Sequence, residues 1–159
     1  MSDMTELNAG GQAFSELLVE VFRVNGLLLA AGDALTRPDG LTCARWQVLG
    51  VVDHGPVTVA QVARTMGLTR QSVRQTAEAL AGAGMVVFVD NPADRRARLM
   101  TLTDAGRAAL RRVEQRQAGW ASAVAGRLPH SELRAALAVL RDLGDLLEDE
   151  QERTPNAAG

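Results

Sequence analysis

Apolar residues at helical spacing dominate the first part of the chain. Phe14, Leu18 and Val21 follow one another at intervals of four and three, and Leu28 continues the same stripe. Residues on such a stripe lie on one face of an amphipathic helix. The pattern therefore predicts a long helix over residues 12–35, which a turn-prone segment with proline and glycine then ends.

Three threonines predict the starts of shorter helices in the middle of the chain. Thr42, Thr58 and Thr69 each precede a segment with helical apolar spacing, and threonine is a favoured N-cap. Gln61 stands three residues after Thr58, which matches a capping box. The helices that begin after Thr58 and Thr69 are separated by a short turn, so they are predicted to form a helix-turn-helix.

Two β-prone runs follow, Met85–Val89 and Leu99–Leu102, with a segment rich in Asp and Pro between them. This composition predicts a β-hairpin. The turn carries Arg95 and Arg96, and arginine at a hairpin tip suits a narrow, negatively charged groove such as the minor groove of DNA. A helix-turn-helix followed by such a hairpin predicts a winged helix-turn-helix, an architecture that holds DNA.

After the hairpin the pattern again predicts long helices. Thr103 followed by Asp104 suits a helix start, and Leu137, Leu140 and Leu147 mark one face of the last helix. Together with the first helix, these stripes expose more apolar surface than one winged-helix lobe can cover, which predicts a homodimer. Two-fold symmetry then predicts a near-palindromic DNA operator with half-sites about one helical turn apart.

The predicted fold class is mainly α with a small β-hairpin wing. It is a winged helix-turn-helix with N- and C-terminal dimerisation helices. Residues 1–159 are predicted to form a single domain. Within it, residues 41–103 are predicted to form the DNA-binding lobe, and residues 12–35 and 104–150 the dimerisation helices.

The helix that begins after Thr69 offers side chains for reading DNA. Val73, Ala77 and Leu80 share one face and should face the core, which turns the opposite face outward. Arginine can bind guanine and glutamine can bind adenine in the major groove, whereas threonine and serine hydroxyls suit phosphate. The predicted DNA-binding residues are Thr69, Arg70, Gln71, Ser72, Arg74 and Gln75 on this helix, with Asp94, Arg95 and Arg96 on the hairpin.

Charge and composition narrow the class of protein. The net charge is −2, yet residues 41–103 hold seven arginines against four acidic residues, so the basic surplus lies on the predicted DNA-binding lobe. A single cysteine, and polar first residues without a secretory signal, predict a cytoplasmic protein. No apolar run reaches the ~20 residues of a membrane span.

The sequence also argues against metal binding and catalysis. Two histidines and one cysteine offer no zinc cluster, so no metal or other cofactor is predicted. The sequence contains neither a Gly-rich phosphate loop nor an arrangement typical of a catalytic triad, so no enzyme activity is predicted.

Five segments carry a family resemblance: Leu41-Thr42, Arg45-Trp46-Gln47-Val48-Leu49, the helix-turn-helix 58–83, Asp94-Arg95-Arg96 and Leu102-Thr103-Asp104-Ala105-Gly106. They resemble the MarR family of bacterial transcriptional regulators, and the order of elements is similar over residues 12–150. The resemblance implies a homodimer with interlocked terminal helices, most often a repressor. It also implies that Asp94 orients Arg96, which enters the minor groove.

The resemblance further implies that a small phenolic or lipophilic molecule binds in a cleft beside the DNA-binding lobe. The residues predicted near such a cleft are Phe22, Asn25, Leu29, Trp46, Val48 and Arg107. This mostly apolar set suits a small aromatic or lipophilic acid. The alternative interpretation is that these side chains simply fill the core.

Two alternative functions stay open at this point. A winged-helix protein-interaction module without DNA binding would share the fold, although it would not need arginines on the wing and the outward helix face. A redox-sensing regulator could use Cys43, because a nearby helix N-terminus can lower a thiol pKa. A lone cysteine is, however, more often a small buried filler.

Overall fold

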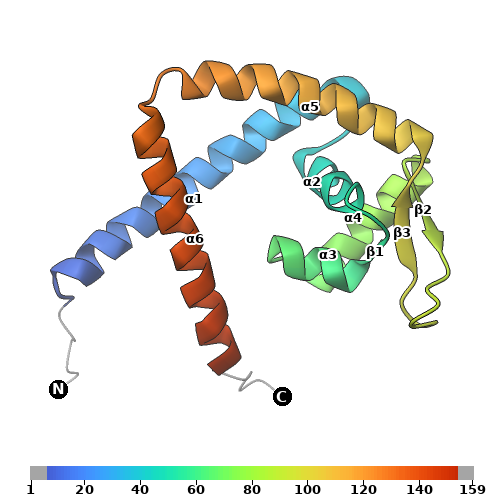
Figure 1. Ribbon diagram of the computed structural model, residues 1–159, viewed down its shortest axis with the longest axis horizontal. Helices are drawn as coiled ribbons and strands as arrows, with labels where there is room; N and C mark the ends of the chain where they lie inside the picture. Colours follow the sequence, from blue (N-terminus) through green and yellow to red (C-terminus); the bar gives the residue numbers. More distant parts are fainter. Residues whose placement is uncertain (1–6, 154–159) are drawn as a thin grey trace. The chain divides into compact units, whose positions relative to one another are not determined.

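The computed structural model describes residues 7–153, and residues 1–6 and 154–159 lie outside the described part. The prediction that the chain starts without a secretory signal concerned residues 1–11, and residues 1–6 of that segment lie outside the described part. The described chain forms helices and one small sheet (Figure 1). The elements are α1 (Ala9–Thr36), η1 (Arg37–Asp39), α2 (Cys43–Val52), β1 (Val57–Thr58), α3 (Val59–Met66), α4 (Arg70–Gly82), β2 (Val86–Val89), β3 (Leu99–Leu102), α5 (Asp104–Ala125) and α6 (His130–Arg153).

The chain divides into two compact units, and the boundary falls within α5. The first unit ends at Arg116 and contains the sheet and the helices from α1 to α4. The second starts at Gln117 and contains the end of α5 and all of α6. The predicted fold class, mainly α with a small β-hairpin, is confirmed. None of the described helices combines the length and the apolar character needed to cross a membrane.

Both helices of the helix-turn-helix begin at the predicted N-caps. Thr58 Oγ1 accepts a hydrogen bond from the N–H of Gln61 at 3.2 Å, and Gln61 Oε1 accepts one from the N–H of Thr58 at 2.8 Å. This reciprocal pair is the predicted capping box. Thr69 Oγ1 accepts from the N–H of Ser72 at 3.1 Å and starts α4. Between the helices, Gly67 has φ of 62°, the left-handed conformation that favours glycine.

The wing is an antiparallel sheet with the strand order β1-β3-β2. Its hairpin pairs Val86 with Leu102 and Val89 with Leu99, which confirms the predicted hairpin. β1 was not predicted, because a strand of two residues leaves no alternating pattern in the sequence. It pairs Thr58 with Leu99, so the residue that caps α3 also joins the helix-turn-helix to the wing.

The core of the first unit lies between α2, α3, α4, α5 and the sheet. Val73, Ala77 and Leu80 of α4 are buried, as predicted, and they fix which face of α4 turns outward. α5 adds Leu110 and Val113 from its first half. The buried apolar core begins at residue 41, and the described residues of α1 do not belong to it.

α1 and α6 keep large apolar side chains exposed in this single chain. Val19 and Phe22 of α1 are 66% and 72% exposed, and Leu146 of α6 is 63% exposed. Gly32 and Thr36 are the buried residues of α1, and α6 has none. Apolar stripes of this extent are typical of surfaces that contact another chain.

Candidate nucleic-acid interface

The outward face of α4 includes the residues predicted from the sequence. Because Val73, Ala77 and Leu80 are buried, the opposite side of the helix faces solvent. The predicted residues at and after the N-cap are all exposed: Thr69, Arg70, Gln71, Ser72, Arg74 and Gln75. They occupy the first turns of the helix, where backbone N–H groups and the helix dipole favour phosphate.

Bonds between side chains and backbone order the tip of the wing. Asn91 Nδ2 donates to the carbonyl oxygen of Ala97 at 2.9 Å, across the turn. Asp94 Oδ1 accepts from the backbone N–H of Arg96 at 2.9 Å. Asp94 therefore orders the backbone at Arg96, and the side chains of Arg95 and Arg96 stay exposed.

Arg98 is a third arginine of the wing, and it is absent from the residues predicted from the sequence. Its Nη2 donates to the carbonyl oxygen of Phe88 at 2.6 Å, and its guanidinium lies 5.8 Å from the centroid of the Phe88 ring. Both contacts hold the side chain across the hairpin. Arg98 could have been predicted from its position directly before β3, because a long side chain at the start of a strand can reach the neighbouring strand.

An open groove of about 560 Å³ lies between α4 and the wing. Its lining includes Arg70 and Arg74 from α4 and Arg96 and Arg98 from the wing, together with the first residues of α3. Glu78 is the acidic residue of the lining. Four guanidinium groups against one carboxylate make the groove positive, so it attracts a polyanion.

The groove contains some of the predicted residues and leaves others outside. Gln71, Gln75 and Arg95 are exposed but do not belong to its lining. The residues predicted to bind DNA did not include Glu78 or the first residues of α3, which also line the groove. Glu78 could have been selected from its spacing, because it follows Arg74 by four residues and therefore lies on the same helix stripe.

A second cavity, of about 950 Å³, lies within the unit that ends at Arg116. Asn25 and Leu29, two of the residues predicted for an effector cleft, line it from α1. Gln47 of α2 and Met66 of α3 also line it. The cavity therefore combines apolar surface with amide and carboxylate groups.

The other four residues predicted for the effector cleft lie elsewhere. Val48 is 1% exposed and belongs to the apolar core, whereas Phe22 is 72% exposed. Trp46 is half-buried and packs against the core. Arg107 Nη1 donates to Asp53 Oδ1 at 2.9 Å.

Cys43 is a buried packing residue at the start of α2. It lies so close to Gly32 that a Cβ added to Gly32 would be 2.4 Å from the Cys43 Sγ. Burial raises the pKa of the Cys43 thiol, and the negative charge of Asp33 raises it further. Both effects act in the direction opposite to the lowering by a helix N-terminus on which a redox-sensing role for Cys43 would depend. The thiol is therefore held in its less reactive, protonated form.

A helix-turn-helix that presents arginine and glutamine beside an arginine-bearing hairpin defines the winged-helix class of DNA-binding proteins. A comparison with family models agrees, since the model of the MarR family matches residues 39–97, from η1 to the wing. The chain belongs to the MarR family, whose members are transcription regulators and not enzymes.

Two relatives illustrate the similarity in sequence. An uncharacterised protein of Mycobacterium tuberculosis is 38% identical over 128 residues, which are 80% of this chain and 87% of the relative. The transcriptional activatory protein BadR of Rhodopseudomonas palustris is 29% identical over 97 residues, which are 58% of this chain and 55% of BadR.

Two solved structures illustrate the similarity in fold. The transcriptional repressor CouR bound to a 23-mer DNA duplex matches with a TM-score of 0.71 and 29% identity, over 88% of this chain and 99% of CouR. The MarR protein of Staphylococcus aureus, in complex with salicylate and kanamycin, matches with a TM-score of 0.76 and 15% identity. That match covers 87% of this chain and 95% of the other.

Proposed function

We propose that this chain forms a homodimer that binds a specific, near-palindromic DNA operator and represses transcription. The groove lined by four arginines carries the proposal, because it joins the outward face of α4 to the wing within one lobe. In this arrangement α4 enters the major groove while the wing reaches the adjacent minor groove. The similarity to CouR, a transcriptional repressor bound to DNA, supports repression over activation. The similarity to BadR, an activatory protein, is weaker support for activation because that match covers a smaller share of the chain.

The side chains of α4 divide between reading bases and holding phosphates. Thr69 and Ser72 lie at the N-terminus of the helix, where a hydroxyl can donate to a phosphate oxygen. Arginine and glutamine further along the outward face match the donors and acceptors of base edges. The residues proposed to read bases are Arg70, Gln71, Arg74 and Gln75.

The wing supplies the contacts to the minor groove and its rims. Arg96 enters the minor groove, and Asp94 supports it indirectly by holding its backbone N–H. Arg95 and Arg98 contact phosphates along the rim, which strengthens binding to every sequence alike.

The dimer forms through the exposed apolar faces of α1 and α6. Phe14 of α1 is 40% exposed in the single chain, and Leu137, Leu140 and Leu147 of α6 are 37%, 48% and 43% exposed. Burying these side chains against a second copy removes them from water. Sedimentation should therefore detect a dimer at micromolar concentration, and a stable monomer would contradict this step.

A small aromatic or lipophilic effector relieves repression by binding in the cavity beside α1. Its volume of about 950 Å³ suits a small ligand. Glu114 on the lining is already paired with Arg111 at 2.6 Å, so the negative charge there is compensated. Salicylate and its neutral amide should both be titrated into the DNA complex. If millimolar ligand changes neither tryptophan emission nor DNA affinity, this cavity is not the effector site.

The experiment that tests the proposed function is a gel shift with the DNA upstream of the chain's own gene. The unaltered protein should bind this duplex more tightly than a random duplex of equal length. Arg70→Ala with Arg74→Ala should abolish the difference, whereas Arg127→Ala, an exposed arginine between α5 and α6, should keep it. Equal, weak binding to both duplexes by the unaltered protein would favour a protein-interaction module.

A further inference from the structure

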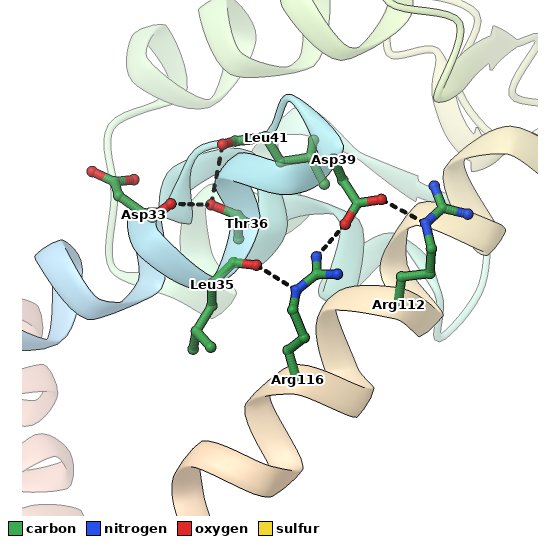
Figure 2. A network of polar contacts seen from close by, with 7 residues as sticks. All are labelled: Asp33, Leu35, Thr36, Asp39, Leu41, Arg112 and Arg116. Carbon is green, nitrogen blue, oxygen red and sulfur yellow. Dashed lines mark hydrogen bonds and ion pairs between the residues drawn. The ribbon is translucent and has the colours of Figure 1, made fainter.

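The C-terminal end of α1 meets the DNA-binding lobe through polar contacts rather than through the apolar core (Figure 2). The Thr36 hydroxyl is buried and lies 3.1 Å from the carbonyl oxygen of Leu41 and 3.2 Å from that of Asp33. The Asp33 side chain also accepts from the N–H of Cys43 at 2.7 Å. This junction therefore combines the close packing of Gly32 against Cys43 with directional bonds, and single substitutions can change the bonds.

Asp39, in the turn η1, is the centre of the junction. Its carboxylate accepts from Arg112 Nε at 2.6 Å and from Arg116 Nη2, both on α5. Arg116 Nε also donates to the carbonyl oxygen of Leu35 at 2.8 Å, at the end of α1. The Asp39 side chain is only 6% exposed. The side chains of Arg112 and Arg116 are 55% and 33% exposed, so water screens them while the carboxylate between them is shielded. Removing the carboxylate charge breaks both contacts to α5 at once, so a substitution here acts on the junction itself.

The start of α5 is fixed to the wing. Thr103 Oγ1 donates to the carbonyl oxygen of Gly84 at 2.7 Å. The backbone N–H of Thr103 donates to the carbonyl oxygen of Met85 at 3.1 Å. Gly106, in the first turn of α5, leaves no room for a Cβ beside Met85. One continuous helix therefore joins the wing to Asp39 and the end of α1.

A second acidic residue holds α5 in a different way. Asp53 follows α2 and accepts from Arg107 and Arg111 at 2.9 Å each. This pair joins α5 to α2, and both helices contribute to the core of the lobe. Arg107 and Arg111 thus act within the lobe, whereas Arg112 and Arg116 join the lobe to the end of α1.

We propose that Asp39, Arg112 and Arg116 are positioning residues that set the orientation of α1 relative to the DNA-binding lobe. The inference rests on the proposed function, since in a dimer joined through α1 this orientation decides how far apart the two α4 helices lie. A dimer contacts both half-sites only when that separation matches the operator. Weakening the junction widens the range of separations and leaves the face that contacts DNA unchanged.

The test compares Asp39→Asn with Asp53→Asn as the matched control, each in the full-length protein. The unaltered protein first selects duplexes from a random pool, and base pairs are then inserted or deleted between the half-sites. We expect Asp39→Asn to bind the selected duplex about tenfold more weakly, within the range typical of coupling between sites. It should also tolerate altered spacing, whereas Asp53→Asn should keep the original preference. An unchanged spacing preference in Asp39→Asn overturns the inference.

A measurement without DNA separates the inference from the proposed function. A spin label at Gln75→Cys reports the distance between the two α4 helices of a dimer, while Cys43 is kept and stays unlabelled because it is buried. Asp39→Asn and Arg116→Gln should each broaden the distance distribution, and unchanged distributions in both folded variants overturn the positioning role. A monomer overturns both proposals. Broadening in a protein that selects no duplex supports the positioning role and overturns the proposed function.

Discussion

The contact between α5 and the turn before the wing predicts a large loss of stability for Gly106→Ala. The added Cβ would lie 1.9 Å from the carbonyl oxygen of Met85 and 2.8 Å from its carbonyl carbon. Both atoms belong to the backbone, so no side chain can rotate away from the clash. Thr103 donates to the same oxygen at 3.1 Å, so moving Met85 also disturbs the cap of α5.

The magnitude follows from this geometry. Overpacking costs about 1–3 kcal/mol, and a clash between a Cβ and backbone belongs at the upper end. The better helix propensity of alanine offsets at most about 1 kcal/mol, which leaves a net loss of about 2 kcal/mol or more. Urea unfolding followed by circular dichroism measures this loss.

Gly82→Ala is the matched control for Gly106→Ala. Gly82 is the last helical residue of α4, and nothing lies within 4 Å of a Cβ added there. This control should therefore be neutral or stabilising, by up to about 1 kcal/mol. If Gly106→Ala lost less stability than about 1 kcal/mol, the steric reasoning would be refuted.

Three further predictions concern the DNA contacts and the junction at α1. Arg96→Ala should weaken binding to a selected duplex by about 1–3 kcal/mol without unfolding the protein, and Asp94→Ala should cost less because it acts through the backbone of Arg96. Unchanged affinity in folded Arg96→Ala would exclude the wing as a DNA contact. Substitutions at Gln71 or Arg74 should relax the preference for one DNA sequence, whereas Arg95→Ala should weaken binding to all sequences alike. Competition with altered duplexes distinguishes these results. Burial alone would raise the pKa of Asp39, but hydrogen bonds from Arg116 and Arg112, with their charges, hold this pKa below its ordinary value. Ionised Asp39 therefore stabilises the fold above the unfolded pKa of about 3.9, and this stabilisation is lost as pH falls through the lower folded pKa. The difference in unfolding free energy between the unaltered protein and Asp39→Asn should be largest near neutral pH and shrink in acid, and a difference independent of pH would contradict this account.

The DNA-binding lobe could be predicted because the forces that start and end its helices act over a few residues. Thr58 and Gln61 form their capping box within one turn, and Val73, Ala77 and Leu80 reveal the buried face of α4 by spacing alone. Arg70 and Arg74 of the groove then follow, since the buried face determines which side chains of α4 point outward, whereas Arg98 of the wing was missed.

Contacts between distant parts of the chain could not be predicted in the same way. Arg116 and Asp39 are 77 positions apart, and no local pattern indicates that an arginine of α5 meets the turn after α1. Val48 was assigned to an effector cleft because apolar residues suit both a cleft and a core, and only packing places it in the core. The raised pKa of Cys43 likewise depends on burial and on Asp33, ten positions earlier in the chain.

The salt dependence of DNA binding tests the central claim most directly. Affinity for a selected duplex should be measured between about 50 and 200 mM salt, for the unaltered protein and for Arg96→Ala. Because four arginines line the groove of each lobe and are proposed to contact phosphates or the minor groove, affinity should fall steeply with salt, and the variant should show a shallower slope. A flat response of the unaltered protein over this range would contradict the account of the arginine-lined groove as a DNA-binding surface.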